Sequence, residues 1–196
     1  MNSLKRLHRD MNQLRNNPLE GIEAMLIDEK DFYEWVAYIK GPDNTCWEGG
    51  IFKLSLKFGN NYPTNAPSVK FVTPMFHPNV YKSGEICLDL LQNNWSPINN
   101  VSSILLSIQS LLTDPNCQSL ANSEAGRLYL DNKLEYAKKV EEIVEASLDM
   151  VEKDFPEDDD DEFEDEDEGE KKNDDNKIEE EGRMVEECEM MIEEES

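Results

Sequence analysis

Histidine and paired cysteines are scarce in this sequence. Its 196 residues include only two histidines, His8 and His77, and no two cysteines stand in a C-x-x-C pair. A structural zinc site needs about four clustered nitrogen or sulfur ligands, so we predict no metal site. The four cysteines are Cys46, Cys87, Cys117 and Cys188.

Long apolar stretches are missing as well. The sequence shows neither a signal peptide nor an apolar run of about 18 residues, the length that a membrane-spanning helix requires. We therefore expect no membrane association and a cytoplasmic and nuclear location. Because such compartments are reducing, the thiols should be free.

Basic residues are few relative to acidic ones. The chain has 19 lysines and arginines against 44 aspartates and glutamates, a formal net charge of −25. Nucleic-acid binders derive much of their affinity from Lys and Arg contacts to phosphates, and anionic membranes attract the same side chains. The composition argues against both of these partners and favours basic protein surfaces.

The negative charge is concentrated near the C-terminus. Residues 152–196 contain 25 acidic and 5 basic side chains, a net charge of −20, whereas residues 1–151 have a net charge of −5. A segment with so much charge does not fold by itself, whereas about 150 residues is a typical domain size. We predict a folded domain at 1–151 and a disordered acidic tail at 152–196.

Apolar periodicity predicts the first elements of the folded part. Leu4, Leu7, Met11 and Leu14 share one helical stripe, and Pro18 lies just past its end. Four stretches rich in β-branched and aromatic residues follow, separated by turns, at 21–28, 32–40, 50–58 and 68–73. They predict an antiparallel meander with one face in water and the other covered.

Helical spacing returns in the second half of the domain. It is found at 101–112, at 122–130 and from Leu134 to Val151. The predicted class is α+β, with a helix, a four-stranded sheet, an irregular loop and three further helices.

The irregular loop runs from Thr73 to Pro97 and contains Cys87. Long irregular segments inside compact domains are often functional. Ile86 and Leu88 can anchor the loop while the thiol between them points outward. Since most free cysteines behave as small buried hydrophobes, this position alone indicates a thiol nucleophile only weakly.

The motifs around this cysteine resemble those of the ubiquitin-conjugating enzyme family. The resemblance extends over residues 1–150. It rests on His77-Pro78-Asn79, Ile86-Cys87-Leu88, Trp95-Ser96-Pro97, Tyr62-Pro63, Asp114-Pro115-Asn116, Gly41-Pro42, Glu48-Gly49-Gly50 and the amino-terminal run LKRLHR.

This resemblance implies a fold and an activity. The fold is that of the family, the UBC fold, which is the α+β arrangement described above. The activity is the transfer of ubiquitin from the activating enzyme to a cysteine, as a thioester, and then to a lysine of a protein substrate. The enzyme is expected to need no cofactor, because ATP is consumed by the activating enzyme upstream.

The resemblance also implies roles for single residues. Cys87 would carry the thioester. Asn79 would stabilise the oxyanion that forms when lysine attacks, or it could hold the loop through backbone hydrogen bonds. His77 would brace the loop. The pocket for the incoming lysine would be shaped by Tyr81, Asp89 and Ser119, the last standing where many members have an acidic residue.

Activating enzyme and ubiquitin ligases would share one surface, built from the first helix and two loops. The residues of this surface are Lys5, Arg6, Arg9, Pro63, Thr64, Ser96, Pro97 and Ile98. Many ligase-binding members have a large aromatic residue at the position of Thr64. Its absence weakens the case for ligases that rely on an aromatic anchor there.

The acidic tail resembles one branch of the family, in which such tails dock on basic grooves of cullin-type ligases. That branch carries an acidic insertion after the catalytic cysteine, whereas here only seven residues separate Cys87 from Trp95. The assignment to this branch therefore stays open, with a solubilising tether as the alternative.

Three other functions are compatible with parts of the sequence. A cysteine–histidine hydrolase would need a histidine oriented onto the thiol by a third group. A non-catalytic ubiquitin-binding relative would have no need of Cys87. An enzyme for another ubiquitin-like modifier would keep the same chemistry, although the acidic body favours ubiquitin.

Overall fold

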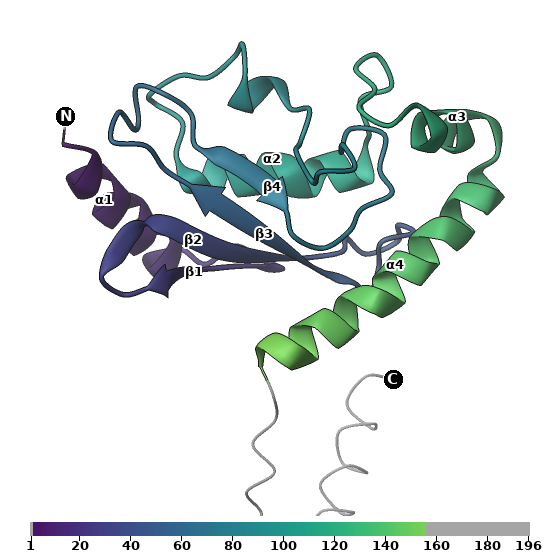
Figure 1. Cartoon of the computed structure of the whole chain (residues 1–196), viewed down its shortest axis with the longest axis horizontal. Helices are drawn as coiled ribbons and strands as arrows, with labels where there is room; N and C mark the ends of the chain where they lie inside the picture. The colour runs from purple at the N-terminus through teal and green to yellow at the C-terminus, as the bar shows by residue number, and fades with distance from the viewer. Residues whose placement is uncertain (1, 156–196) are drawn as a thin grey trace, which may run out of the picture. The chain divides into compact units, whose positions relative to one another are not determined.

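The computed structural model describes residues 2–155, and Figure 1 shows their arrangement. The elements are α1 (Ser3–Asn16), β1 (Ile22–Asp28), β2 (Asp31–Lys40), β3 (Ile51–Lys57), β4 (Ser68–Phe71), the short 3-10 helix η1 (Asp89–Leu91), α2 (Val101–Thr113), α3 (Ser123–Asp131) and α4 (Lys133–Asp154). The predicted α+β class and element order are confirmed. The predicted tail, apart from residues 152–155, lies outside the described residues.

The four strands form one antiparallel sheet in the order β1-β2-β3-β4. Leu54 of β3 lies opposite Ala37 of β2, and both are fully buried. Their neighbours in sequence point to the other face, where Lys57 and Lys70 are exposed. The predicted division into a covered face and a solvent face is therefore confirmed.

α2 covers the apolar face of the sheet (Figure 1). It begins with a capping box: the Asn100 side chain accepts from the Ser103 amide at 2.8 Å, and the Ser103 hydroxyl accepts from the Asn100 amide at 3.1 Å. Its inward face joins the same core as the sheet through Val101, Ile104, Leu105, Ile108, Leu111 and Leu112.

α1 buries three of the four residues of the predicted stripe, Leu7, Met11 and Leu14, which are confirmed. The prediction is wrong for Leu4, which is 39% exposed. Arg6 and Asp10 are buried in its place, with Arg6 Nε 2.8 Å from Asp10 Oδ1. Apolar spacing does not reveal such a pair, because each charge is tolerated inside only through the other.

α4 extends three residues past the boundary predicted at Val151. Asp154, its last residue, accepts hydrogen bonds from the Tyr38 hydroxyl at 2.9 Å and from the Lys53 ammonium at 2.7 Å. The ring of Phe155 packs on that of Tyr38, with centroids 5.5 Å apart. The folded part therefore includes Phe155.

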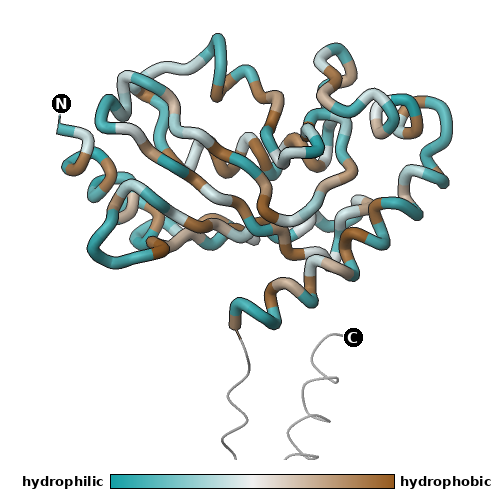
Figure 2. The backbone as a smooth tube through the Cα atoms, in the orientation of Figure 1, coloured by the Kyte–Doolittle hydropathy of each residue, from teal (hydrophilic) through white to brown (hydrophobic). Residues whose placement is uncertain are grey.

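Hydropathy alternates along α4, as Figure 2 shows, which is the pattern of an amphipathic helix. Tyr136 and Val140 are buried against the rest of the domain. Leu134 belongs to the predicted apolar stripe but is 71% exposed.

Candidate active site

Cys87 lies at the end of a small loop that returns on itself. Val80 and Ile86 form an isolated β-bridge, and the Cys87 amide donates to the Asn79 carbonyl at 2.8 Å. Gly84 makes the reversal, with a φ of +84° and a space in which a Cβ would come within 2.1 Å of the Phe71 carbonyl oxygen. Ile86 is buried beside a half-buried Cys87, so the apolar neighbour anchors the loop.

The hydroxyl of Ser119 lies beside the thiol. Cys87 Sγ and Ser119 Oγ are 3.0 Å apart, and either atom can be the donor. Ser119 belongs to the segment between α2 and α3, which forms the opposite wall of the site. The two walls, 32 residues apart in sequence, therefore meet at the sulfur.

His77 holds the first of these walls to α2. Its Nδ1 accepts from the Asn79 amide at 3.0 Å, so Nε2 carries the proton and donates to the Leu111 carbonyl at 3.0 Å. The side chain is fully buried, and this burial lowers the pKa of His77 to about 4. His77 is therefore a neutral brace with both ring nitrogens engaged, and it offers Cys87 no base.

Pro78 and Asn79 complete this brace. The Pro78 carbonyl accepts from the amides of Ala121 and Asn122, at 2.8 and 3.0 Å. His77, Pro78 and Asn79 thus tie the cysteine loop to five residues between Leu111 and Asn122.

The Asn79 side chain is fully buried and fully engaged. Its Nδ2 donates to the carbonyls of Asn116 and Ser119, both at 2.8 Å, and its Oδ1 accepts from the Asn116 amide at 2.8 Å. Both amide hydrogens are therefore used in this arrangement. The geometry is that of a staple, and an oxyanion would have to draw one hydrogen away from a carbonyl.

Tyr81 and Asp89 lie on either side of Cys87 in sequence. Tyr81 is 44% exposed and begins the turn that Gly84 closes, through a hydrogen bond from the Gly84 amide to its carbonyl. Asp89 is exposed and begins η1, where its carbonyl accepts from the amides of Gln92 and Asn94. Both residues are thus exposed on the loop that contains Cys87.

The predicted docking surface is assembled around buried polar groups. Arg6 Nη1 donates to the Pro97 carbonyl at 2.7 Å, and Nη2 donates to the Asn99 carbonyl. The Tyr62 hydroxyl donates to Asp10 at 2.5 Å, and burial raises the pKa of Tyr62, which keeps this donor protonated. These bonds hold the loop at Tyr62 and the loop at Pro97 against α1.

The prediction that Arg6 contacts a partner is wrong. Its side chain is only 4% exposed, and its guanidinium donates to Asp10 and to two backbone carbonyls. Arg6 therefore positions the surface. Pro63 is also buried, with its carbonyl accepting from Trp95 Nε1 at 2.9 Å.

The remaining docking residues are accessible to a partner. Ser96 is half-buried, and Ile98, at 84%, is the most exposed of the large apolar side chains in the described part. The exposed members are Lys5, Arg9, Thr64, Pro97 and Ile98. The structure thus brings the three predicted segments together.

The sequence did not reveal which residues form hydrogen bonds with His77, Pro78 and Asn79. Leu111, Asn116 and Ala121 act through backbone groups, which their side chains do not reveal. The only signal was the Asp114-Pro115-Asn116 motif, whose terminal asparagine meets Asn79.

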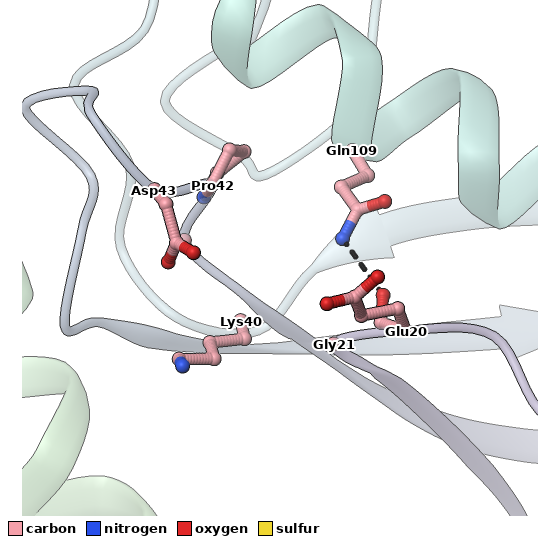
Figure 3. A pocket seen from close by; sticks show the side chains of 7 residues that line it. Glu20, Gly21, Lys40, Pro42, Asp43 and Gln109 are labelled. Atoms are coloured by element: carbon pink, nitrogen blue, oxygen red, sulfur yellow. Dashed lines mark hydrogen bonds between the residues drawn. The ribbon is translucent and has the colours of Figure 1, made fainter. Parts of the chain in front are cut away.

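A hollow of about 290 Å3 lies away from this site, between Lys40, Asp43 and the α2 residue Gln109 (Figure 3). Gln109 Nε2 donates to the Glu20 carbonyl there at 3.2 Å. No predicted active-site or docking residue lines it. Within residues 2–155 there is no cluster of metal-ligating side chains and no helix long and apolar enough to cross a membrane.

Together, the fold and the site define a class of protein. An α+β domain presents a partly exposed thiol on a braced loop, beside a hydroxyl and without a histidine base. This arrangement suits acyl transfer through a cysteinyl thioester, because a thioester is already activated and its sulfur is a good leaving group.

Comparison with known proteins gives the family. The model of the family described as ubiquitin-conjugating enzyme matches residues 6–144. The chain is 53% identical over 143 residues to ubiquitin-conjugating enzyme E2 3 of Arabidopsis thaliana, an alignment that covers 73% of this chain and 95% of the relative. The chain therefore belongs to the ubiquitin-conjugating enzyme family.

Two further relatives support the same assignment. Ubiquitin-conjugating enzyme E2 1 of Caenorhabditis elegans is 50% identical over 145 residues, 74% of this chain and 75% of the relative. Ubiquitin-conjugating enzyme E2 2 of Yarrowia lipolytica is 49% identical over 143 residues, 73% of this chain and 94% of the relative. The protein is a transferase that forms a thioester, and its family partners are ubiquitin, the activating enzyme and ubiquitin ligases.

Proposed function

We propose that Cys87 is the residue that carries ubiquitin. The observation that supports this most is the position of its sulfur, half-buried on a loop that His77-Pro78-Asn79 ties to the opposite wall, 3.0 Å from the Ser119 hydroxyl. Cys46 and Cys117 are also half-buried, and the Cys117 thiol donates to the Pro115 carbonyl at 3.7 Å.

The proposed reaction has two steps. In charging, Cys87 Sγ attacks the ubiquitin thioester on the activating enzyme, a new carbon–sulfur bond forms, and the activating enzyme's thiolate leaves. In discharge, a neutral lysine amine attacks the carbonyl on Cys87. The bond to Sγ breaks, the departing thiolate takes up the proton that the amine loses, and an isopeptide remains on the substrate.

Ser119 acts at the sulfur in both steps. Its hydroxyl can donate to Sγ when the thiolate attacks or leaves, at the 3.0 Å separation that the structure shows. An aspartate at this position would instead attract the lysine ammonium. We propose that Ser119 stabilises the thiolate and, with Tyr81 and Asp89, shapes the approach of the lysine.

Asn79 positions this hydroxyl and, we propose, also serves the oxyanion. Its bond to the Ser119 carbonyl holds the residue that faces the sulfur. During discharge, the developing negative charge competes with the Asn116 and Ser119 carbonyls for the amide hydrogens, since a charged acceptor is stronger than a neutral one.

The docking surface serves the activating enzyme and ligases. Its exposed members Lys5 and Arg9 offer positive charge, and Ile98 offers an apolar contact. We propose that both classes of partner bind here and therefore compete. Simultaneous binding of a ligase and the activating enzyme to one molecule, measured by sedimentation, would rule this out.

We further propose that the acidic tail directs the enzyme to ligases with basic grooves, such as the cullin type. Residues 152–196 carry a net charge of −20, and charge of this density accelerates association with an oppositely charged surface. Because no acidic insertion follows Cys87, the acidic tail is the only feature on which this proposal rests.

The proposed location is the cytoplasm and nucleus, where activating enzyme and ATP are available. A fluorescent fusion confined to membranes or secreted from the cell would contradict it. The plan of a compact core followed by an acidic tail also resembles the conjugating enzyme of African swine fever virus, and we propose a viral source. A coding sequence found in cellular chromosomes and absent from purified virus particles would contradict that source.

The experiment for the central proposal is a charging assay. The protein is incubated with activating enzyme, ATP and ubiquitin, and gels are run with and without reductant. We expect one reductant-sensitive adduct, which Cys87→Ala abolishes. The matched variants Cys46→Ala and Cys117→Ala should charge normally, and an equal adduct on Cys87→Ala would contradict the assignment.

A further inference from the structure

α4 has a second apolar stripe beside the one that it buries in the core. The buried stripe includes Tyr136 and Val140. The second, which we call the outer stripe, recurs at alternating steps of three and four residues, the heptad spacing by which one helix packs along another. Its residues are Leu134, Ala137, Glu141, Val144, Leu148 and Val151.

The outer stripe is accessible to a partner. Leu134 is 71% exposed and Leu148 is 39% exposed. Ala137, Val144 and Val151 are half-buried, and Val144 packs in part against the core. α4 runs along the edge of the domain (Figure 1). Exposed apolar side chains that follow one another in this way, next to charged ones, are typical of a protein interaction site.

A hollow of about 560 Å3 lies along the first part of the outer stripe. One wall belongs to α4, from Leu134 to Glu145, and the other to Cys46 and Glu48 in the segment between β2 and β3. The α4 wall extends over about three helical turns, or about 17 Å. No residue of the Cys87 site or of the docking surface lines this hollow.

The charges around this hollow are mainly negative. Glu48, Glu141 and Glu145 line it, and Lys138 is the only basic residue that does so in the described part of the chain. Glu141 and Glu145 lie one turn apart on α4, where like charges repel each other. Among residues 2–155, none of these carboxylates takes part in an ion pair. Basic side chains of a partner would relieve the repulsion.

An apolar stripe with acidic neighbours specifies its occupant. Apolar side chains of a second helix can pack along the outer stripe, while its lysines or arginines pair with Glu141 and Glu145. We propose that this part of α4 binds a basic amphipathic helix of a partner protein. A second copy of the chain is less suitable, because two α4 helices would bring the same glutamates together. The net charge of −20 on residues 152–196 disfavours the acidic tail for the same reason.

The test compares two peptides that differ only in charge. Both have leucine at the a and d positions of about three heptads, and the e and g positions are lysine in one peptide and glutamate in the other. Each is titrated into the 15N-labelled full-length chain, and amide shifts are followed by NMR. We expect the lysine peptide to shift residues 46–48 and 134–151. It should bind there roughly tenfold more tightly than the glutamate peptide, the effect of a few exposed charge pairs.

A first pair of variants tests the apolar contact. Leu134→Asn should weaken binding of the lysine peptide roughly tenfold, because a leucine side chain is no longer buried on binding. Leu106→Asn is the matched control. It replaces a leucine of α2 that is 45% exposed, and it should leave the affinity unchanged.

A second pair of variants tests the charges. Glu141→Lys combined with Glu145→Lys should reverse the preference, so that the glutamate peptide binds more tightly. Glu142→Lys combined with Asp149→Lys changes the net charge by the same amount at exposed positions of α4 outside the outer stripe. This control should still prefer the lysine peptide.

Three results would overturn the proposal: shifts confined to the acidic tail, an affinity that Leu134→Asn leaves unchanged, or a preference that survives the reversal of Glu141 and Glu145. A dimer of the chain that buries residues 134–151 and does not bind the lysine peptide would also overturn it. Because the assay contains neither ubiquitin nor activating enzyme, its outcome is independent of the role of Cys87.

Discussion

The active site and the docking surface are both held by buried polar groups, but of different kinds. In the active site, His77 and Asn79 are neutral and bond mainly to backbone. At the docking surface, a buried ion pair, Arg6–Asp10, holds α1 to the loop at Pro97. The hydrogen bonds of the active site therefore stabilise one loop, whereas the docking surface depends on a charge pair whose loss destabilises the whole domain.

The largest effect is expected from breaking that ion pair. Arg6→Ala leaves Asp10 buried and uncompensated, which should lower the free energy of unfolding by about 3–5 kcal/mol. Lys5→Ala, one residue away and exposed, should change it by less than about 0.5 kcal/mol. Urea unfolding of both variants measures this, and equal stabilities would remove the distinction between the two regions.

His77 should make stability depend on pH. Its pKa is about 4 in the folded state, against about 6.5 for an unperturbed histidine. Above pH 6.5 His77 is neutral in both the folded and the unfolded state, so it does not change the free energy of unfolding. As the pH falls from 6.5 to 4, only the unfolded state takes up the proton, and about 3 kcal/mol of stability is lost.

The matched variant for His77 is His77→Gln, which keeps a donor for the Leu111 carbonyl but does not titrate. Urea unfolding between pH 4 and 7 should show a shallower decline for this variant than for the wild type. Parallel curves would mean that His77 is not a buried neutral brace.

A variant of Asn79 tests whether this side chain takes part in the reaction or only holds the loop. Loss of an oxyanion donor costs about 3 kcal/mol, or roughly a hundredfold in rate. Asn79→Ala should therefore charge near normally and discharge to free lysine roughly a hundredfold more slowly. If charging falls as much as discharge in single-turnover assays, Asn79 is only a staple.

The tail should give a smaller effect that depends on salt. A truncation after Phe155, which keeps the bonds of Asp154, should fold and charge Cys87 normally. Ligase-stimulated discharge should fall roughly tenfold at low salt. The truncated and full-length chains should converge as the Debye length shrinks from about 10 Å at 0.1 M to about 3 Å at 1 M salt. Equal rates at every salt concentration would leave the tail a solubilising tether.

The sequence was sufficient to predict the elements and the cysteine loop, because alternation and helical spacing are local signals. It did not reveal that Arg6 and Asp10 are buried while Leu4 is exposed, since this depends on two loops more than fifty residues away along the chain.

In the active site, too, the sequence identified the candidate residues but not their contacts. Motifs identified Cys87 and Asn79 as candidates, but not the three hydrogen bonds that occupy the Asn79 side chain. The approach of Ser119 to the sulfur likewise follows from the path between α2 and α3 and not from any spacing along the chain.

The most direct test of the account is to locate ubiquitin on the charged protein. The adduct is purified without reductant, digested under acidic conditions that preserve thioesters, and mapped by mass spectrometry. We predict that the C-terminal glycine of ubiquitin is found on the peptide that contains Cys87 and on no other. Ubiquitin attached to Cys46, Cys117 or Cys188 in the wild-type chain would contradict the account.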